Sequence, residues 1–229
     1  MKTIGLIGGT SWVSTAEYYR IINQLTNERL GRLNSAQMLL YSVNFEEFKP
    51  PANPAEWGEI GERFIGIAQR LEKGGADCIV LCANTPHMIA DNIQQKIRIP
   101  LLHIAEMTAR EIKKHKIAAV GLLGTKITME QSFFTGKLSR HGIRSLIPND
   151  EEREFVHAAI FEELTKGIFK KETKERFIEV IAGLKKQGAV GVILGCTEIP
   201  LLVKQADCDL PLFDTTMIHA ASAVDFALE

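Results

Sequence analysis

Residues 188–200 read GAVGVILGCTEIP, and residues 75–87 read GADCIVLCANTPH. Both stretches open with Gly-Ala, continue as an apolar run of strand length and end in a turn that carries polar residues. Two further pairs match in the same order: KTIGLIG at 2–8 with AAVGLLG at 118–124, and IPLLH at 99–103 with LPLFD at 210–214. Counted at Gly5 and Gly121, at Ala76 and Ala189, and at Pro100 and Pro211, the offsets are 116, 113 and 111 residues. Three ordered matches at a nearly constant offset predict two similar halves joined near residue 116.

Strand-like and helix-like segments alternate along both halves. The expected strands are 3–8, 37–45, 77–82, 99–104, 118–124, 143–147, 188–194 and 210–214. The expected helices are 15–30, a segment ending near 73, 86–96, 105–115, 129–141, 150–166, 173–187 and one that closes the chain. The stretch PPANPAEW at 50–57 predicts a proline-rich loop, with Pro54 or Ala55 opening the next helix. Such alternation is typical of parallel strands with helices on both faces, so the sequence predicts an α/β fold.

The repeat also predicts where a ligand binds. We expect two Rossmann-like halves, 1–116 and 117–229, with parallel sheets related by a pseudo-twofold axis. The C-terminal helix at about 216–229 is free to pack back on the first half. Ligands of parallel sheets collect outside the carboxyl ends of the strands. The expected active site therefore lies in the cleft between the halves, where ANT at 83–85 and CTE at 196–198 are equivalent strand ends.

Composition limits the class of protein. The chain has 229 residues, 45% hydrophobic, with a formal net charge of −1, which is enough apolar material for a well-filled core in one or two domains. No basic stripe suggests a nucleic-acid partner, and no apolar run approaches the roughly 20 residues of a membrane helix. The start, MKTIGLIGG, reads into a strand and lacks the features of a signal peptide. We expect a soluble cytoplasmic protein.

The four cysteines are Cys78, Cys82, Cys196 and Cys208. None forms a C-x-x-C pair or has a histidine at metal-ligand spacing, so no metal site is expected. In the cytoplasm the thiols should stay reduced. Laid over each other, the two halves put Ala83, not Cys82, opposite Cys196. Because neighbouring side chains of a strand point to opposite faces, Cys82 should point into the core.

Cys196 follows a glycine and begins the turn into an expected helix. An ordinary thiol has a pKa of about 8.5, and a helix N-terminus can lower it, so a thiolate here could act as base or nucleophile. Thr197 could hold a carboxylate or an enolate oxygen. The alternative for Cys196 is a buried cysteine that ends a strand, but the repeat favours the functional interpretation.

Further candidates lie in the other turns. Asn84 and Thr85 could cap a helix or bind a ligand, and the two roles are compatible. The turns after the first strand of each half, GGTSWVST at 8–15 and GTKITM at 124–129, could bind an anion or serve as ordinary strand-to-helix turns. Neither contains the dinucleotide fingerprint G-x-G-x-x-G, so no nucleotide cofactor is expected. Lys166, before Gly167, could contact a substrate or simply offer a cation to a helix C-terminus.

These features together resemble the aspartate/glutamate racemase family of cofactor-independent amino-acid racemases. The resemblance spans the chain and rests on six stretches, of which GCTE after a GAVGVIL strand is the most specific. They are IGLIGG at the start, ANTPH at 83–87, LLGTKITM at 122–129, IFEELTKG at 160–167, GCTEIP at 195–200 and PLFDTTMIHA at 211–220. The resemblance implies two Rossmann-like halves with the active site between them, a homodimer, and no pyridoxal phosphate or metal. It also implies a cysteine on each side of the substrate α-carbon, one removing the α-proton as thiolate and the other returning a proton.

The resemblance assigns residue roles. Cys196 matches the second catalytic cysteine, and Asn84, Thr85 and Thr197 match residues that hold the substrate α-carboxylate. The ligand turns of the two halves supply Thr10, Thr125 and Thr128. Lys166 matches a lysine that can meet the side-chain carboxylate of an acidic substrate.

Ala83 departs from the family pattern, which has cysteine immediately before Asn-Thr. Three hypotheses follow. The first is a racemase of aspartate or glutamate whose missing thiol is replaced by a water or by a hydroxyl such as that of Thr85. The second is a decarboxylase-like enzyme of the same superfamily that uses one cysteine to protonate an enediolate. The third is a binder of small dicarboxylates without catalysis.

Overall fold

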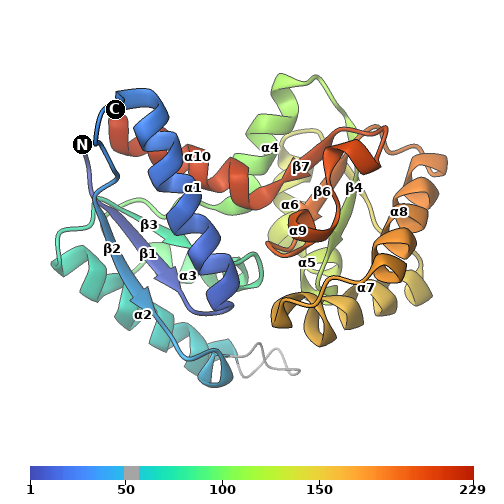
Figure 1. Cartoon of the computed structure of the whole chain (residues 1–229). Coiled ribbons are helices and arrows are strands. Elements are labelled where there is room, and N and C mark those ends of the chain that lie inside the picture. Colours follow the sequence, from blue (N-terminus) through green and yellow to red (C-terminus); the bar gives the residue numbers. More distant parts are fainter. Residues whose placement is uncertain (49–56) are drawn as a thin grey trace. The chain divides into compact units, whose positions relative to one another are not determined.

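The computed structural model describes residues 1–48 and 57–229, and the expected helix start at Pro54 or Ala55 lies outside them. The chain divides into two compact units (Figure 1). Unit 1 comprises Met1–Ile104 and His219–Glu229, and unit 2 comprises Ala105–Ile218. In the part of the chain that the structure describes, no helix combines the length and the apolar composition of a membrane span.

The division differs from the one expected near residue 116. Helix α4 (Ile104–Lys114) lies almost entirely in unit 2, where its Glu106 carboxylate pairs with His141 at 2.9 Å. The last turns of helix α10 (Thr215–Leu228) belong to unit 1, as expected for a C-terminal helix that packs back on the first half. Only the place of α4 differs from the expectation, because the repeat in the sequence does not show tertiary contacts such as that of Glu106 with His141.

Unit 1 contains a parallel sheet of three strands in the order β2-β1-β3. The strands are β1 (Ile4–Gly8), β2 (Met38–Ser42) and β3 (Cys78–Leu81). The helices are α1 (Trp12–Leu30), η1 (Phe45–Glu47), α2 (Trp57–Lys73), η3 (Thr85–Ile89) and α3 (Ala90–Gln94). The apolar run at 99–104 does not form the expected strand but only an isolated bridge between Leu101 and Ile79. On the edge that faces β3, Ile79 N donates to Pro100 O at 2.8 Å and Leu102 N donates to Ile79 O at 2.9 Å. On the other edge, the Gln94 side chain hydrogen-bonds Ile99 O at 3.1 Å and Leu101 N at 2.7 Å.

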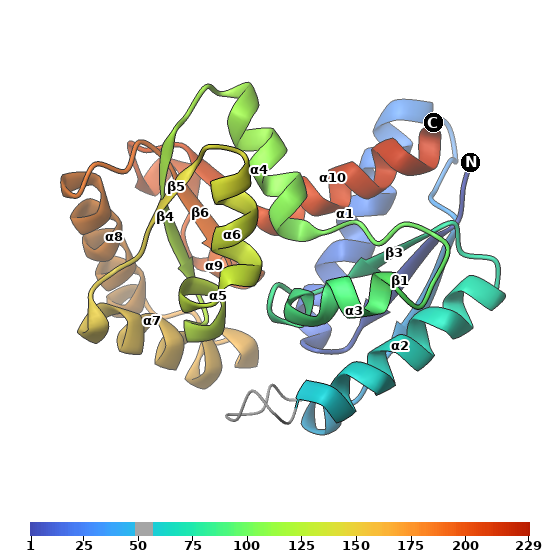
Figure 2. The ribbon, with the colours of Figure 1, turned by 180° about the vertical axis from the view of Figure 1, so that it is seen from behind.

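The core of unit 1 joins both ends of the chain. Helices α1 and α10 lie side by side in Figures 1 and 2, and β1 and β3 pack beneath them. The Lys2 amide donates to Ala227 O at 2.9 Å. Buried side chains at this contact include Tyr18, Ile22 and Val224, each fully shielded from solvent.

Unit 2 repeats the same order with a fourth strand, β5-β4-β6-β7, again all parallel. The strands are β4 (Ala119–Gly124), β5 (Arg144–Leu146), β6 (Val192–Gly195) and β7 (Leu212–Asp214). Besides α4, the helices are α5 (Lys126–Glu130), α6 (Ser132–Arg140), α7 (Asp150–Glu162), η4 (Leu164–Lys166), α8 (Lys171–Lys186), α9 (Ile199–Leu202) and η5 (Gln205–Asp207). The helix expected at 129–141 is broken at Gln131, whose backbone is extended with ψ 148°.

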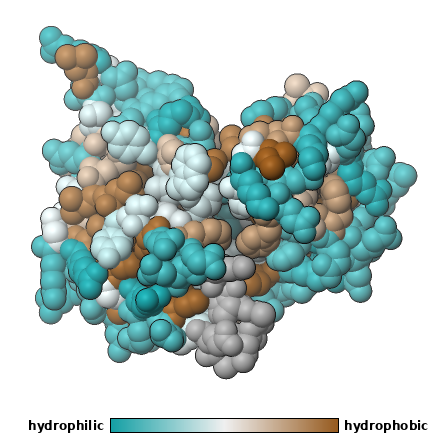
Figure 3. Space-filling model, turned by 60° about the horizontal axis from the view of Figure 1, so that its bottom comes forward, coloured by the Kyte–Doolittle hydropathy of each residue, from teal (hydrophilic) through white to brown (hydrophobic). Residues whose placement is uncertain are grey.

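Hydrophilic residues cover much of the face drawn in Figure 3, and hydrophobic residues gather in several places between them. The parallel sheets and their flanking helices confirm the predicted α/β class.

Candidate active site

The two units carry the same strand register. In unit 1, Gly5 of β1 pairs with Ile79 of β3. In unit 2, Gly121 of β4 pairs with Val192 of β6. Gly121 is the repeat partner of Gly5, and Val192 follows Ala189 as Ile79 follows Ala76. The alignment found in the sequence therefore coincides with the hydrogen-bonded register.

This register fixes the equivalence of the two strand ends. Leu81 ends β3, and its counterpart Leu194 is followed by Gly195, the last residue of β6. Two positions beyond Leu81 stands Ala83, and two positions beyond Leu194 stands Cys196. Ala83 therefore lies in the turn after β3 of unit 1, and Cys196 lies in the turn after β6 of unit 2.

The turn after β1 is tightly constrained. Gly9 has φ +90°, and a Cβ there would lie 2.1 Å from the Val43 carbonyl oxygen, so only glycine fits. The Gly9 amide donates to Thr15 Oγ1 at 2.8 Å, and Thr15 Oγ1 donates to Ser11 O at 2.9 Å. Thr10 lies inside this bonded loop and is buried. The Gly8–Thr15 stretch is thus a rigid turn that holds Thr10 in place.

The ANT turn after β3 is held by hydrogen bonds from neighbouring elements. The Ser14 hydroxyl donates to Cys82 O at 2.6 Å, and His87 Nδ1 donates to Ala83 O at 2.9 Å. Asn84 occupies the position before η3, yet its side chain makes no capping hydrogen bond, so the capping interpretation is wrong for Asn84. Asn84 and Thr85 are both buried at the strand end.

His87 belongs to a buried cluster of three histidines in unit 1. Its ring centroid lies 4.9 Å from that of His103 and 5.3 Å from that of His219. His219 Nε2 donates to Leu102 O at 2.7 Å, and Nδ1 accepts from Tyr18 OH at 2.8 Å. Burial lowers the pKa of His87 to about 4 and that of His219 to about 3, so both are neutral at pH 7. Among residues 1–48 and 57–229, no group of three His, Cys, Asp or Glu side chains is arranged to hold a metal ion.

Cys82 is a core residue, as predicted. Its side chain is 1% exposed and packs with Ile4, Tyr18 and Ala223 in the core of unit 1. Burial alone raises its pKa far above the ordinary value. A thiol in such surroundings stays protonated and inert.

Cys196 is paired with a carboxylate. Its Sγ donates to Glu198 Oε2 at 3.0 Å, and Thr197 Oγ1 donates to the same oxygen at 2.7 Å. All three side chains are buried, with Glu198 2% exposed. A buried carboxylate that accepts from a thiol is a ready proton acceptor for it.

The predicted lowering of the Cys196 pKa is wrong. Helix α9 begins only at Ile199 and spans four residues, so Cys196 does not sit at its N-terminus. Burial raises the pKa of Cys196 well above the ordinary value, and the Glu198 charge raises it further. In this state Cys196 is a protonated thiol, and it becomes a thiolate only if Glu198 or a substrate takes its proton.

Thr125 and Thr128 lie against the end of β6. Gly124 pairs with Gly195 in the β4–β6 register, so Thr125 and Cys196 follow directly on neighbouring strand ends. The Thr128 methyl packs over both glycines, 3.0 Å from a Cβ built at Gly124 and 3.2 Å from one built at Gly195. The hydroxyl oxygens of Thr125 and Thr128 are 3.1 Å apart. The absence of side chains at the glycines therefore lets this turn approach Cys196.

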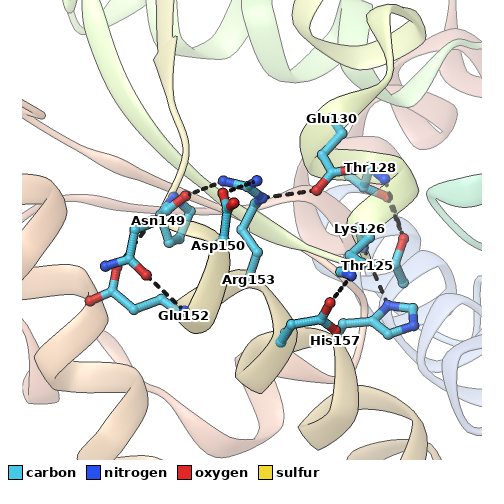
Figure 4. A network of polar contacts seen from close by, with 11 residues as sticks. Thr125, Lys126, Thr128, Glu130, Asn149, Asp150, Glu152, Arg153 and His157 are labelled. Carbon is cyan, nitrogen blue, oxygen red and sulfur yellow. Dashed lines mark hydrogen bonds and ion pairs between the residues drawn. The ribbon is translucent and has the colours of Figure 1, made fainter.

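A polar network from α5 and α7 surrounds that turn (Figure 4). His157 Nδ1 accepts from the Lys126 amide at 3.3 Å, and the Lys126 ammonium pairs with Glu154. Nearby, Arg153 bridges Glu130 at 2.8 Å and Asp150 at 2.6 Å. No sequence pattern points to His157, because it lies 31 residues from Lys126.

Lys166 ends the short helix η4, and its side chain is exposed. Gly167 follows in the left-handed conformation with φ 73°, which closes the helical segment. The lysine therefore lies where a helix-terminal cation would, and its position is equally compatible with a substrate contact.

Glu198 belongs to the GCTE motif of the sequence, but only the structure shows that its carboxylate accepts a hydrogen bond from Cys196.

The sequence profile of the Asp/Glu/hydantoin racemases matches residues 7–223. The chain belongs to this family. The broad specificity amino-acid racemase RacX of Bacillus subtilis is 25% identical over 224 residues, with 96% of each chain covered.

Two solved structures resemble the whole chain. A candidate Asp/Glu racemase from Yersinia pestis is 46% identical with a TM-score of 0.93, and 100% of each chain is covered. An aspartate racemase homologue from Pyrococcus horikoshii OT3 is 39% identical with a TM-score of 0.88, again with 100% of both chains covered. Both matches include the two units and their strand ends.

Proposed function

We propose that the protein is a cofactor-independent racemase of aspartate, glutamate or both, which moves the α-proton with one cysteine, Cys196. The supporting observation is the equivalence of Cys196 and Ala83 at matching strand ends, with Glu198 as the hydrogen-bond partner of the thiol. The names of the relatives point the same way, since they include an amino-acid racemase and an aspartate racemase homologue.

The proton balance runs through Glu198. The Cys196 thiol passes its proton to the Glu198 carboxylate, and the resulting thiolate takes the α-proton of the bound amino acid. An enediolate remains, and a water or a hydroxyl such as that of Thr85 protonates it on the opposite face, where Ala83 offers no proton. The proton held by Glu198 then neutralises the hydroxide or alkoxide left behind, which restores the carboxylate. In the reverse direction the thiol, which its raised pKa keeps protonated, gives its proton to the enediolate.

Binding is assigned to the polar residues of the strand ends. Asn84, Thr85 and Thr197 hold the α-carboxylate. Thr10, Thr125 and Thr128 line the two first-strand turns. Lys166 receives the side-chain carboxylate of an acidic substrate.

A single-cysteine decarboxylase is the second candidate. The observation that favours it is the short Cys196–Glu198 contact in a buried site, because both raise the pKa of the thiol and so keep on it the proton that an enediolate left by loss of carbon dioxide needs. Such a reaction needs a proton on one face only, so the lack of a thiol at Ala83 would not prevent it.

We also propose that the protein acts as a homodimer in the cytoplasm on small amino-acid substrates, without a cofactor or metal. Sedimentation velocity of the purified protein tests the dimer. A monomer at micromolar concentration would contradict it.

Incubation in deuterated water distinguishes the functions. L- and D-aspartate and L- and D-glutamate are each mixed with the protein, and proton NMR follows the α-proton while a chiral assay follows configuration. We expect inversion accompanied by α-deuteration.

Each other outcome supports a different function. Loss of carbon dioxide from an arylmalonate, with no deuteration of the amino acids, would support the decarboxylase. Saturable binding of dicarboxylates with no exchange at carbon would support a binding protein. Cys196→Ser serves as the control in every assay, because its hydroxyl is far less acidic than a thiol.

A further inference from the structure

His157 contacts the candidate site from a helix that carries none of its assigned residues. It lies on α7, and its Nδ1 accepts the backbone N–H of Lys126 at 3.3 Å. Lys126 is the first residue of α5 and directly follows Thr125, whose hydroxyl accepts from the Thr128 amide at 3.3 Å. His157 therefore fixes the backbone next to two proposed substrate-binding residues.

Only the neutral ring can make this bond. The partner is a backbone N–H, so Nδ1 must be unprotonated and the ring proton must lie on Nε2. The side chain is half-buried and packs on Phe161, with 4.8 Å between ring centroids.

The surroundings of the ring both lower and raise the pKa of His157. Burial first, and then the Lys126 ammonium, hold the pKa of His157 below its ordinary value, while Glu154 on α7 and Glu130 on α5 oppose them. The neutral form therefore prevails at pH 7, and acid converts it to the imidazolium, which cannot accept the bond.

The turn packs against the strand end that carries the thiol. The Thr128 methyl packs on Gly124 and Gly195, and Gly195 precedes Cys196. A turn released at Lys126 can shift Thr125 and Thr128 relative to the strand end that carries the thiol. Because His157 is bonded to the backbone, it acts on the substrate only through this turn.

We propose that neutral His157 is a positioning residue that holds the Thr125–Thr128 turn in its substrate-binding form, so that substrate affinity falls when the ring is protonated. This inference rests on the proposed function, because it assumes that the turn binds the substrate.

The experiment compares two variants of opposite design. His157→Leu removes the acceptor, whereas His157→Asn keeps an oxygen near the position of Nδ1. The exposed His115 provides the matched control His115→Leu. KM and kcat for aspartate and glutamate are measured between pH 5 and 8, and nitrogen NMR reports the tautomer of His157 in the wild type.

We expect His157→Leu to raise KM roughly three- to tenfold, the effect of one lost hydrogen bond, with a smaller change in kcat. His157→Asn should restore KM at pH 7 and remove the rise of KM in acid, since its amide does not titrate in this range. The wild-type ring should carry its proton on Nε2 at pH 7.

The failures are distinguishable. If the wild type is active but His157→Leu matches it in KM and pH profile, the inference is wrong and the proposed function stands. A ring protonated on Nδ1 at pH 7 also overturns the inference, even if His157→Leu does not fold. A wild type that neither binds nor converts these amino acids overturns the proposed function and the inference together.

Discussion

The Cys196 thiol donates a hydrogen bond to the buried carboxylate of Glu198, with 3.0 Å between Sγ and Oε2. The Thr197 hydroxyl donates to the same oxygen. These three consecutive residues therefore hold one proton between a thiol and a carboxylate, beside the turn of Thr125 and Thr128.

Glu198→Gln should lower both the pKa of the Cys196 thiol and the rate of turnover. Removing the negative charge lowers the pKa of Cys196, because the Glu198 charge is one cause of its elevation. Removing the carboxylate also removes the proton acceptor, so kcat should fall by roughly 10²- to 10⁴-fold. The measurements are kcat and the pH dependence of alkylation of Cys196, read by peptide mass spectrometry. The exposed Glu46→Gln is the control, and wild-type turnover in Glu198→Gln would refute the acceptor role.

Cys82 and Cys196 should respond oppositely to substitution. Cys82→Ala leaves a small cavity in the core of unit 1 and should cost about 1 kcal/mol of unfolding free energy while most activity remains. Cys196→Ser should keep the fold and lose activity. Urea unfolding and turnover, measured on both variants, test the pair. Complete loss of turnover in a folded Cys82→Ala protein would show that this thiol takes part in the reaction.

Much of the fold could be predicted because the stretches that match between the two halves form strands. The β1–β3 and β4–β6 registers follow the aligned apolar runs, and period-two alternation placed Cys82 in the core. The run at 99–104 was predicted as a strand but forms only one bridge, at Leu101. The Gln94 side chain holds backbone groups on the other edge of the run, a contact that the hydrophobic pattern does not show.

The site was less predictable than the fold. The sequence identified Cys196 but gave the wrong direction for its pKa, since burial and the orientation of Glu198 arise from tertiary packing. His157 reaches the Thr125 turn through an interhelical contact between α5 and α7, which has no local pattern.

Lys166→Met should weaken binding of acidic substrates selectively. The ammonium is exposed at the end of η4, so its removal should leave the fold unchanged. Loss of a charged contact to a carboxylate should raise KM for aspartate or glutamate roughly tenfold or more, with a smaller effect on alanine. Steady-state kinetics on the three amino acids test this, with the exposed Lys186→Met as control. Equal effects on alanine and aspartate would leave Lys166 a helix-terminal cation.

Acid should destabilise unit 1 through its buried histidines. The unfolded chain binds protons at His87 and His219 near the ordinary pKa of 6.5, whereas the folded values are about 4 and about 3. The unfolded state therefore binds more protons below pH 6.5, and stability falls as the pH drops towards 3. The free energies of unfolding measured with urea at pH 7 and at pH 4.5 should differ by a few kcal/mol. His219→Phe should be less stable at pH 7, because Tyr18 and Leu102 lose their partner, but should show a weaker pH dependence. If the stability of His219→Phe falls with pH as steeply as that of the wild type, other groups cause the acid sensitivity.

Ala83→Cys should supply the thiol that the first strand end lacks. Ala83 stands two residues beyond Leu81, as Cys196 stands two residues beyond its counterpart Leu194, and a methyl group cannot transfer a proton. A well-placed general acid or base contributes about 10²- to 10⁴-fold. The gain should be smaller here, because no carboxylate in the ANT turn matches Glu198. Without neighbours arranged to stabilise its thiolate, the new thiol keeps a pKa of about 8.5.

The gain from Ala83→Cys should be largest in the direction that the natural protein runs poorly, because the new thiol serves the face that now relies on water or a hydroxyl. Rates from L to D and from D to L are compared for wild type and variant on aspartate and on glutamate. Ala83→Ser is the matched control, since it adds a side chain of similar size but a much weaker acid. If folded Ala83→Cys gains nothing over Ala83→Ser in either direction, the first strand end does not face the α-carbon. The single-thiol decarboxylase would then be the better account of Cys196.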